Sequence, residues 1–421
     1  MSQLPLGFRA SGLPRKDRPR PSRHGLAFFY SDRPATAAAS FTINEVKCVH
    51  IPLDQEQLKS GKAQVIMVNS GCANCCTGER GVREAKKTIR WCADTLGLNP
   101  KQVLIASTGV IGDFMPMDLL AEEIPMLAKR LRTDDGLSYA SFHKAAEAIM
   151  TTDTTVKIAY ASVTIQGKEV RIWGCCKGAG MIHPAMTLSG RSGGRGERGR
   201  GRSLKGKHAT MLGFILTDAA IAKKELEGFL QTSTDASFNR VTVDGDMSTN
   251  DTIFLLANGA AGVGPKSAAE KQKFAAALDA VCIDLAKKIA KDGEGASKFL
   301  EITVQGACTV AEAQKVAMTV ATSPLVKTAA YGEDSNWGRI LAAMGRSGVR
   351  INPKEVDICF GTLCVFRRGA PTAVSAEAAR EPLKAKEVTL AITLRSGKAK
   401  GLYWTCDFTG GYVDINARYR T

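Results

Sequence analysis

The sequence predicts an α/β protein of two domains, with layered mixed sheets flanked by helices. Three observations support this prediction. The chain has 421 residues, more than a single typical hydrophobic core organises. Its hydrophobic content of 44% is ordinary for a globular protein. Strand-like apolar runs alternate with segments whose apolar residues recur at helical spacing, which is the pattern of a layered α/β architecture.

The expected elements follow one another along the chain. Residues 64–69 (QVIMVN) and 102–106 (QVLIA) are apolar runs typical of buried strands, and residues 82–96 and 117–131 have apolar residues at helical spacing. Residues 158–174 predict a hairpin that turns at Gln166-Gly167-Lys168. Further on, residues 219–230 and 267–291 predict amphipathic helices, and residues 357–421 alternate strands with polar breaks.

The chain shows no sequence signal for a membrane span or a secretory leader. No apolar run approaches the roughly 18 residues that a membrane-spanning helix needs. The first 30 residues lack the apolar centre of a secretory signal. They are rich in arginine, which is also typical of organellar transit peptides. We therefore expect a cytoplasmic protein with no membrane partner, or an organellar one if the source is eukaryotic.

The net charge of +16 raises the question of nucleic-acid binding. Much of the charge lies in two segments. Residues 9–23 hold six basic side chains and one Asp, and residues 185–208 hold five Arg, two Lys and one Glu. No aromatic residue interleaves with either segment, so the stacking platforms that bind single strands are missing. We predict no nucleic-acid partner, although attraction of anionic substrates stays open.

The 12 cysteines show no framework of a small secreted domain, and we expect them to be reduced thiols. Cys72, Cys75 and Cys76, together with Cys175 and Cys176, have spacings that also occur in zinc sites. A firm set of four ligands is absent from these spacings. The prediction is therefore that the protein has no metal site.

The run ATMLGFILTDA, residues 209–219, contains the most informative candidate, Thr210. A threonine in mid-chain is a poor nucleophile because its hydroxyl has no base beside it by default. Cleavage of the Ala209–Thr210 peptide bond would give Thr210 a free α-amine, whose pKa is roughly 7.7–8.0. One residue would then hold both the nucleophile and its general base. Taken alone, the run favours an ordinary buried strand that begins with a threonine.

Several further segments, in order along the chain, resemble the ornithine acetyltransferase (glutamate N-acetyltransferase) family. KGAGMIHP (177–184) and ATMLGFILTDA resemble the two halves of its self-cleavage motif. The other matching segments are SDRPATAAASFTINEVK (31–47), NSGCANCCTG (69–78), ASTGVIG (106–112), MTTDT (150–154), VDGDMSTNDT (243–252), DGEGASKF (292–299), NWGRILAAMGRSG (336–348) and WTCDFTGGYVDINARYRT (404–421). The resemblance implies the layered fold of this family, which is similar to N-terminal-nucleophile enzymes.

The resemblance also implies an activity and a set of site residues. Thr210 would take the acetyl group of N2-acetylornithine and pass it to glutamate, in the cyclic pathway of arginine biosynthesis. Thr108 and Gly109 would form the oxyanion hole, and Ala209 and Thr210 the cleavage site. The residues that would bind substrate are Thr151, Lys177, Thr210, Glu294, Asn416 and Thr421. No cofactor is implied, and acetyl-CoA remains open as a co-substrate that some family members use.

Cleavage would divide the chain into an alpha chain, residues 1–209, and a beta chain, residues 210–421. By the resemblance, the two remain associated, and we expect a heterotetramer with two copies of each. In the family, two residues separate the proline of the Gly-rich turn from the Ala-Thr pair. Here 24 residues, 185–208, intervene between Pro184 and Ala209. Their Gly-Arg-Ser composition predicts a disordered linker.

The insertion leaves alternatives open. It is either a tolerated loop, or an error in the coding-sequence model, or a change that prevents self-cleavage and leaves an inactive member of the family. Thr187, which also follows the Gly-rich turn, lacks the ATMLGFILTDA sequel, so Thr210 is the preferred nucleophile. Two other functions remain: an amidohydrolase in which water replaces glutamate, and a non-catalytic protein whose Arg-Gly insertion binds nucleic acid. The first would release acetate without an acceptor, and the second would bind with steep salt dependence.

Overall fold

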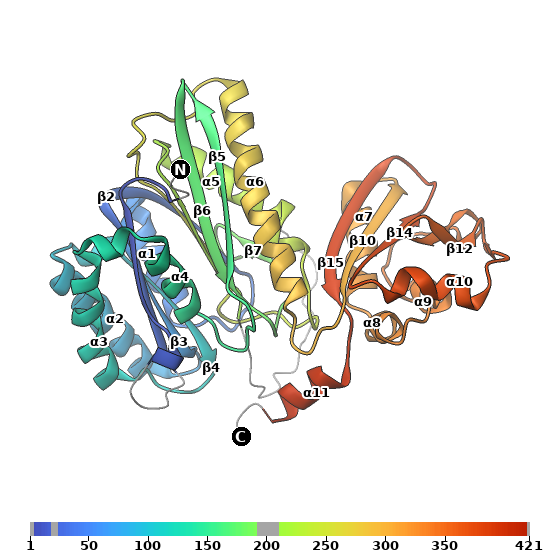
Figure 1. Cartoon of the computed structure of the whole chain (residues 1–421), viewed down its shortest axis with the longest axis horizontal. Helices are drawn as coiled ribbons and strands as arrows, with labels where there is room; N and C mark the ends of the chain where they lie inside the picture. The colour runs from blue at the N-terminus through green and yellow to red at the C-terminus, as the bar shows by residue number, and fades with distance from the viewer. Residues whose placement is uncertain (1–3, 18–23, 192–209, 419–421) are drawn as a thin grey trace. The chain divides into compact units, whose positions relative to one another are not determined.

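The computed structural model describes residues 4–17, 24–191 and 210–418. These residues form two compact units. The larger unit lies within Met1–Asn239 and Met247–Ala286, and the smaller unit lies within Arg240–Asp246 and Lys287–Thr421. Each unit has one sheet with helices packed against it (Figure 1). The prediction of a two-domain α/β protein with mixed sheets is therefore confirmed.

The larger unit has a mixed sheet of nine strands in the order β4-β3-β2-β9-β8-β6-β5, with β1 and β7 also paired to β2. The pairs β3–β4 and β8–β9 are parallel, and the other pairs are antiparallel. The strands are β1 (Phe8–Leu13), β2 (Gly25–Thr42), β3 (Lys62–Cys72), β4 (Val103–Val110), β5 (Lys157–Ile165), β6 (Lys168–Lys177), β7 (Met186–Thr187), β8 (Leu212–Thr217) and β9 (Thr252–Ala257).

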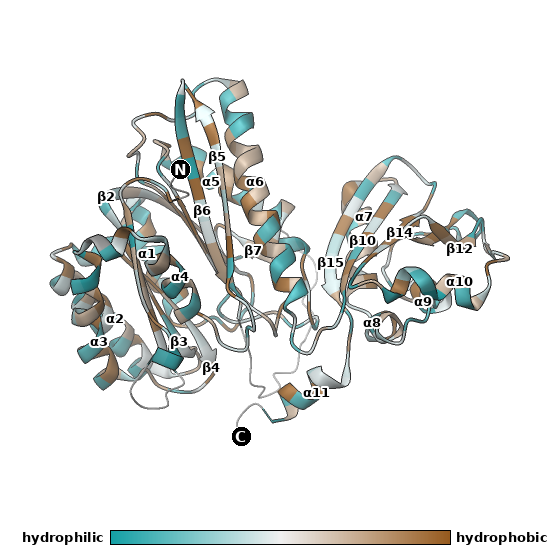
Figure 2. Ribbon diagram, viewed as in Figure 1, coloured by the Kyte–Doolittle hydropathy of each residue, from teal (hydrophilic) through white to brown (hydrophobic). Residues whose placement is uncertain are grey.

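Helices cover both faces of this sheet because successive side chains of a strand point to opposite faces. Phe28 on β2 packs in the cluster that includes α2 and α3, whereas the next residue, Phe29, packs in the cluster that includes α1 and α4. Figure 2 shows both hydrophobic and hydrophilic residues on α2 and α3, as expected for helices with one buried side. The helices are α1 (His50–Gln57), α2 (Gly78–Leu96), α3 (Met117–Leu131), α4 (Tyr139–Ala148), α5 (Lys223–Ala236) and α6 (Ala268–Lys291).

The smaller unit has a six-stranded sheet in the order β13-β12-β11-β14-β10-β15. Its apolar core joins the sheet to α7 and α9, for example through Val316, Val320 and Ile340. The strands are β10 (Phe299–Ala307), β11 (Asp357–Phe360), β12 (Leu363–Arg367), β13 (Ala370–Pro371), β14 (Glu387–Thr393) and β15 (Ala399–Cys406). The helices are α7 (Val310–Ala321), α8 (Pro324–Tyr331), α9 (Trp337–Gly345), α10 (Ala376–Arg380) and α11 (Gly410–Ala417).

The expected cut before Thr210 does not coincide with the division between the units. Strand β8, which begins two residues after Thr210, lies between β6 and β9 in the sheet of the larger unit. It pairs with β6 from Ile172 to Lys177. Both prospective chains therefore contribute strands to one sheet.

The start of the insertion also belongs to this sheet. Met186 and Thr187 form β7, which pairs with Thr42 and Phe41 of β2. The amide of Leu188 donates to Gln231 on α5, at 3.1 Å. The first residues of the insertion are therefore ordered, whereas a disordered linker was predicted for the whole of 185–208. Residues 192–208 lie outside the described residues, so the prediction for that part stays untested.

The expectation that every cysteine is a free thiol is wrong for one pair. Cys359 on β11 and Cys364 on β12 form a disulfide. They are paired residues of an antiparallel hairpin, so their backbones approach each other closely. The sequence does not display this register, whereas the other ten cysteines are free thiols as expected. Among the described residues, no helix is both long enough and apolar enough to cross a membrane.

Candidate active site

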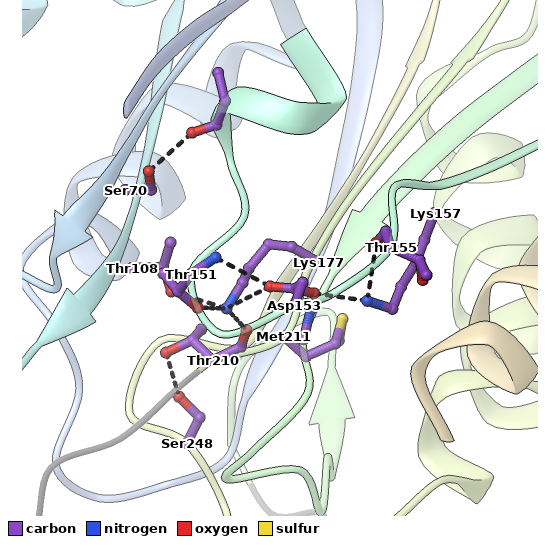
Figure 3. Close-up of polar contacts among 12 residues, drawn as sticks. Ser70, Thr108, Thr151, Asp153, Thr155, Lys157, Lys177, Thr210, Met211 and Ser248 are labelled. Carbon is purple, nitrogen blue, oxygen red and sulfur yellow. Dashed lines mark hydrogen bonds and ion pairs between the residues drawn. The ribbon is translucent and has the colours of Figure 1, made fainter. Parts of the chain in front are cut away.

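Thr210 lies in the interior of the larger unit, just before β8 begins. Its side chain is buried, with 2% of the residue exposed. The hydroxyl oxygen Oγ1 lies 2.9 Å from Oγ of Ser248 (Figure 3). The next amide, that of Met211, donates to Oδ1 of Asp251 at 3.0 Å. The expected nucleophile is therefore held from two sides by polar groups that are shielded from water.

Lys177 brings three of the expected site residues together. It ends β6, and its backbone pairs with Leu212 of β8, so its side chain starts beside Thr210. Its ammonium donates to the carbonyl oxygen of Thr210 and to Oγ1 of Thr151, both at 2.7 Å, and to Oγ1 of Thr108 at 3.4 Å. Figure 3 shows these contacts converging on one nitrogen. Lys177 is completely buried, so each contact is shielded from solvent screening.

Asp153 supplies the negative charge that makes this buried cation tolerable. One carboxylate oxygen accepts from the ammonium of Lys157 at 2.7 Å and from the amide of Gly178 at 2.6 Å. The other accepts from the amide of Thr151 at 3.0 Å and lies 3.9 Å from the ammonium of Lys177. Burial disfavours the charged form, but the two lysines outweigh it and hold the pKa of Asp153 below its usual range. Asp153 was not predicted as a site residue, and its only sequence signal is its place as the acidic residue of the MTTDT segment.

The expected oxyanion residues lie at the end of β4. Thr108 is buried, and because its hydroxyl accepts from Lys177, its own proton is available to a substrate oxygen. Gly109 has a φ of +130°, and a Cβ there would overlap the carbonyl carbon of Gly71 on β3. Only glycine meets both conditions. This strand end can present a backbone amide and a hydroxyl to a developing oxyanion.

The segment 248–251 joins the nucleophile to the oxyanion strand. It lies within the matching segment VDGDMSTNDT, but none of its residues was predicted as a site residue. The side-chain amide of Asn250 donates to the carbonyls of Ala73 and Ser107, each at 2.8 Å. The backbone amide of Asn250 donates to Oγ of Ser248 at 3.1 Å. Ser107 immediately precedes Thr108. Asn250 therefore fixes the distance between the oxyanion strand and the hydroxyl that contacts Thr210.

Asp251 is a completely buried carboxyl beside this network. Burial raises its pKa to about 7, against the opposing effects of the Met211 amide, Lys177 and Ser248. Its Oδ2 has no hydrogen-bond partner among the described residues. A carboxyl in this state exchanges a proton near neutral pH.

The smaller unit brings together two other expected site residues. Glu294 lies in the loop after α6 and is 6% exposed. The side-chain amide of Asn416, on α11, donates to Oε2 of Glu294 at 2.8 Å. Gly295 allows this approach because a Cβ there would overlap the amide of Tyr412 at the start of α11.

Two expected site residues, Ala209 and Thr421, lie outside the described residues. The alternative nucleophile Thr187 is on β7, where its hydroxyl contacts Ser189 and Arg191. It shows none of the contacts that surround Thr210. Within residues 4–17, 24–191 and 210–418, no group of three or more His, Cys, Asp or Glu side chains could hold a metal ion.

Comparison with known proteins gives the family. The profile of the ArgJ family matches residues 11–421. This chain belongs to the ArgJ family. Proteins named arginine biosynthesis bifunctional protein ArgJ are similar to it over nearly their whole length. The relative from Desulfotalea psychrophila is 46% identical over 95% of this chain and 95% of its own. The relative from Symbiobacterium thermophilum is 43% identical over 99% of this chain and 98% of its own.

Solved structures of the ArgJ family are also similar. The arginine biosynthesis bifunctional protein ArgJ from Bacillus halodurans has 44% sequence identity and a TM-score of 0.46, and the match covers 48% of this chain and 95% of that chain. The ornithine acetyltransferase from Mycobacterium tuberculosis, solved with ornithine, has 30% identity and a TM-score of 0.36. Its match covers 44% of this chain and 95% of that chain. The profile match and the relatives from Desulfotalea psychrophila and Symbiobacterium thermophilum confirm the family resemblance carried by the sequence motifs.

Proposed function

We propose that this chain is a self-cleaving enzyme that moves the acetyl group of N2-acetylornithine to glutamate through an acetyl ester on Thr210. Membership of the ArgJ family makes it an acetyltransferase of arginine biosynthesis. The observation that carries the proposal is the environment of Thr210, where a buried hydroxyl lies 2.9 Å from Ser248 and its residue is bound by Lys177 at 2.7 Å.

Cleavage of the Ala209–Thr210 bond gives Thr210 the α-amine that serves as its base. The amine takes the hydroxyl proton while Oγ1 attacks the acetyl carbonyl of N2-acetylornithine. The C–N bond of the amide breaks, and ornithine leaves with a proton from the α-ammonium. The α-amine of glutamate then attacks the ester, and N-acetylglutamate leaves while Oγ1 regains a proton. Each step is easier than direct exchange between two amides because the ester is the more reactive acyl donor.

Thr108 and Gly109 stabilise the two tetrahedral oxyanions, the first by its hydroxyl and the second by its backbone amide. Lys177 binds this hydroxyl and the Thr210 carbonyl, and Thr151 binds Lys177. Both residues belong to the substrate-binding set. Glu294 offers a carboxylate suited to an ammonium of ornithine, with Asn416 bound to it at 2.8 Å. Thr421 completes the set. The proposed mechanism uses no metal or cofactor. Use of acetyl-CoA as a second acetyl donor is a separate part of the proposal, supported by relatives that are named bifunctional.

The two chains produced by cleavage remain one enzyme. Strand β8 of the second chain is hydrogen-bonded to β6 of the first, and β9 to β2. Separating the chains would expose these buried strands to water. We propose a heterotetramer with two copies of each chain, which size-exclusion chromatography with light scattering can measure.

The test is the intact mass of the purified chain and of a Thr210→Ala variant, with acetyl transfer measured on the same samples. We expect two fragments divided between Ala209 and Thr210 in the wild type, one uncut chain in the variant, and transfer only by the wild type. A single inactive wild-type chain would contradict the proposal. Release of acetate at the same rate with and without glutamate would instead indicate an amidohydrolase.

A further inference from the structure

Self-cleavage of the uncut chain needs a group that accepts the hydroxyl proton of Thr210, and the proposed function does not identify it. Before cleavage, the nitrogen of Thr210 is part of a peptide bond, and its lone pair is delocalised and not basic. The α-amine therefore cannot take the hydroxyl proton in the step that creates it. Thr210 is 2% exposed, so bulk water offers no ready substitute. Another group of the chain must accept this proton.

The hydrogen bonds of Ser248 set the direction in which the proton travels. A serine hydroxyl has two acceptor lone pairs and one proton to donate. Ser248 Oγ accepts from the amide of Asn250 at 3.1 Å and lies 2.9 Å from Oγ1 of Thr210. When Thr210 donates to it, both lone pairs are occupied and the proton of Ser248 is left for an acceptor.

Asp251 lies three residues after Ser248, and the two side chains contact consecutive residues: Ser248 contacts the hydroxyl of Thr210, and Asp251 binds the amide of Met211. Its interaction with Ser248 lowers the pKa that burial has raised. Oδ1 accepts from the amide of Met211 at 3.0 Å, and this amide belongs to the residue after the nucleophile. Oδ2 has no hydrogen-bond partner among the described residues, so it has a lone pair open to a proton. One oxygen of the Asp251 carboxyl is thus fixed by the amide next to Thr210, and the other can accept a proton.

We propose that Ser248 and Asp251 together accept the hydroxyl proton of Thr210 during self-cleavage, an inference that rests on the proposed function. As Oγ1 bonds to the carbonyl carbon of Ala209, its proton passes to Ser248 and the proton of Ser248 passes to Asp251. The C–N bond then breaks, and Asp251 returns the proton to the leaving nitrogen of Thr210. Water hydrolyses the resulting ester, which restores the hydroxyl and leaves a carboxyl on Ala209.

The charges around Asp251 suit this task. Lys177 on β6 favours its ionised form and is itself balanced by Asp153. On the side of α1, His50 contacts Thr252, and burial lowers its pKa to about 3, so it is neutral. Burial also raises the pKa values of the Cys48 and Cys75 thiols and of the Asp54 carboxyl on α1. Among these groups, Asp251 is the one that binds the amide of the residue after the nucleophile.

The experiment follows self-cleavage during cell-free synthesis of the full chain, with timed quenching and quantification of the fragments. Asp251→Asn keeps an acceptor for the Met211 amide but cannot take a proton. Ser248→Ala removes the hydroxyl that passes the proton from Thr210 to Asp251. We expect cleavage to slow by on the order of 100-fold in both, the scale of general-base catalysis. The wild-type rate should rise with pH through about 7 and then level, and this rise should disappear in Asp251→Asn.

Asp54→Asn is the matched control. Asp54 is also completely buried, accepts from one backbone amide (that of Ile105, at 3.0 Å), and has an Oδ2 without a partner among the described residues. No contact links it to Thr210 in the described residues. Its variant should cleave at the wild-type rate, which separates loss of a buried carboxylate in general from loss of this one.

Two further readouts distinguish a proton acceptor from a purely structural residue. Asp251→Glu and Ser248→Thr retain the proton-transferring groups and should recover much of the cleavage rate. The loss of the pH-dependent rise in Asp251→Asn is the second readout, because a merely displaced nucleophile would slow cleavage and keep that rise. Wild-type cleavage rates in Asp251→Asn would overturn this inference alone, whereas a wild-type chain that never cleaves would overturn the proposed function as well.

Discussion

The ammonium of Lys177 lies 2.7 Å from the carbonyl oxygen of Thr210. Because the same nitrogen also contacts Thr151 and Thr108, one side chain fixes the nucleophile against the oxyanion strand. The hydrogen-bonded register of β6 and β8 places Lys177 opposite Leu212 and so makes the contact possible. The geometry of the site therefore follows from strand pairing, and several consequences can be measured.

Replacing Lys177 by Met should abolish the positioning of Thr210 without adding bulk. Acetyl transfer should fall by on the order of 100-fold or more, the scale seen when a fixed donor is removed from an acyl-transfer site. The measurement is kcat/KM, normalised to the fraction of cleaved enzyme. Lys86→Met, which removes an exposed lysine on α2, is the control and should leave this value unchanged. Equal activity of the two variants would contradict the role assigned to Lys177.

Asp153→Asn should destabilise the fold by about 3–5 kcal/mol at neutral pH, because it leaves buried lysines without their counter-charge. The pKa of Asp153 is lower in the folded chain than in the unfolded chain. Its stabilising effect is therefore complete above the unfolded value of about 3.9 and is lost as pH falls below it. Denaturant unfolding of the uncut Thr210→Ala chain, with and without Asp153→Asn, checks this. A difference that does not shrink at low pH would refute the assignment.

Gly109→Ala should eliminate transfer, because the new Cβ would overlap the backbone of Gly71 and displace the oxyanion strand. Gly112→Ala provides a matched comparison. Gly112 also has a positive φ, of +90°, but nothing lies within 4 Å of a Cβ placed there. Both variants carry backbone strain, so the difference in their activity isolates the effect of the overlap. Comparable activity in both would show that the close approach at Gly109 is dispensable.

Glu294→Gln should weaken binding more than it slows cleavage. The lost charge is the one proposed to meet an ammonium of ornithine, so KM for N2-acetylornithine should rise by roughly tenfold, the effect of losing a charged hydrogen bond. Self-cleavage should proceed normally, since the hydrogen bond of the Glu294 carboxylate is to Asn416 and the proposed cleavage groups are Thr210, Ser248 and Asp251. Steady-state kinetics with fragment analysis tests both points. Loss of cleavage with an unchanged KM would contradict the assignment.

The sequence predicted most elements of the larger unit because their apolar residues have clear periodicity. The hairpin expected at 158–174 is β5 and β6, and the helix expected at 117–131 is α3. The helices α7, α8 and α9 were not predicted individually. They belong to residues 310–345, for which no helical periodicity was proposed.

Only those site residues that match a motif of the family could be predicted from the sequence. The resemblance named Thr108, Lys177 and Thr210, and the structure brings these three together. It gave no reason to select Asp153 or Asp251, because their importance comes from burial and from neighbours remote in sequence. Asp251 acquires its environment from Met211 and Lys177, 40 and 74 positions earlier in the chain. The disulfide between Cys359 and Cys364 was missed for the related reason that strand register is not visible in the sequence.

The most direct test of the central claim is to trap the acetyl group on Thr210. Cleaved enzyme is mixed with N2-acetylornithine in the absence of glutamate, quenched in acid, digested and analysed by mass spectrometry. We expect the peptide beginning at Thr210 to gain one acetyl group on its hydroxyl. Added glutamate should remove this group while N-acetylglutamate appears. An unmodified Thr210 peptide, in an enzyme that still transfers acetyl groups at full rate, would contradict the account.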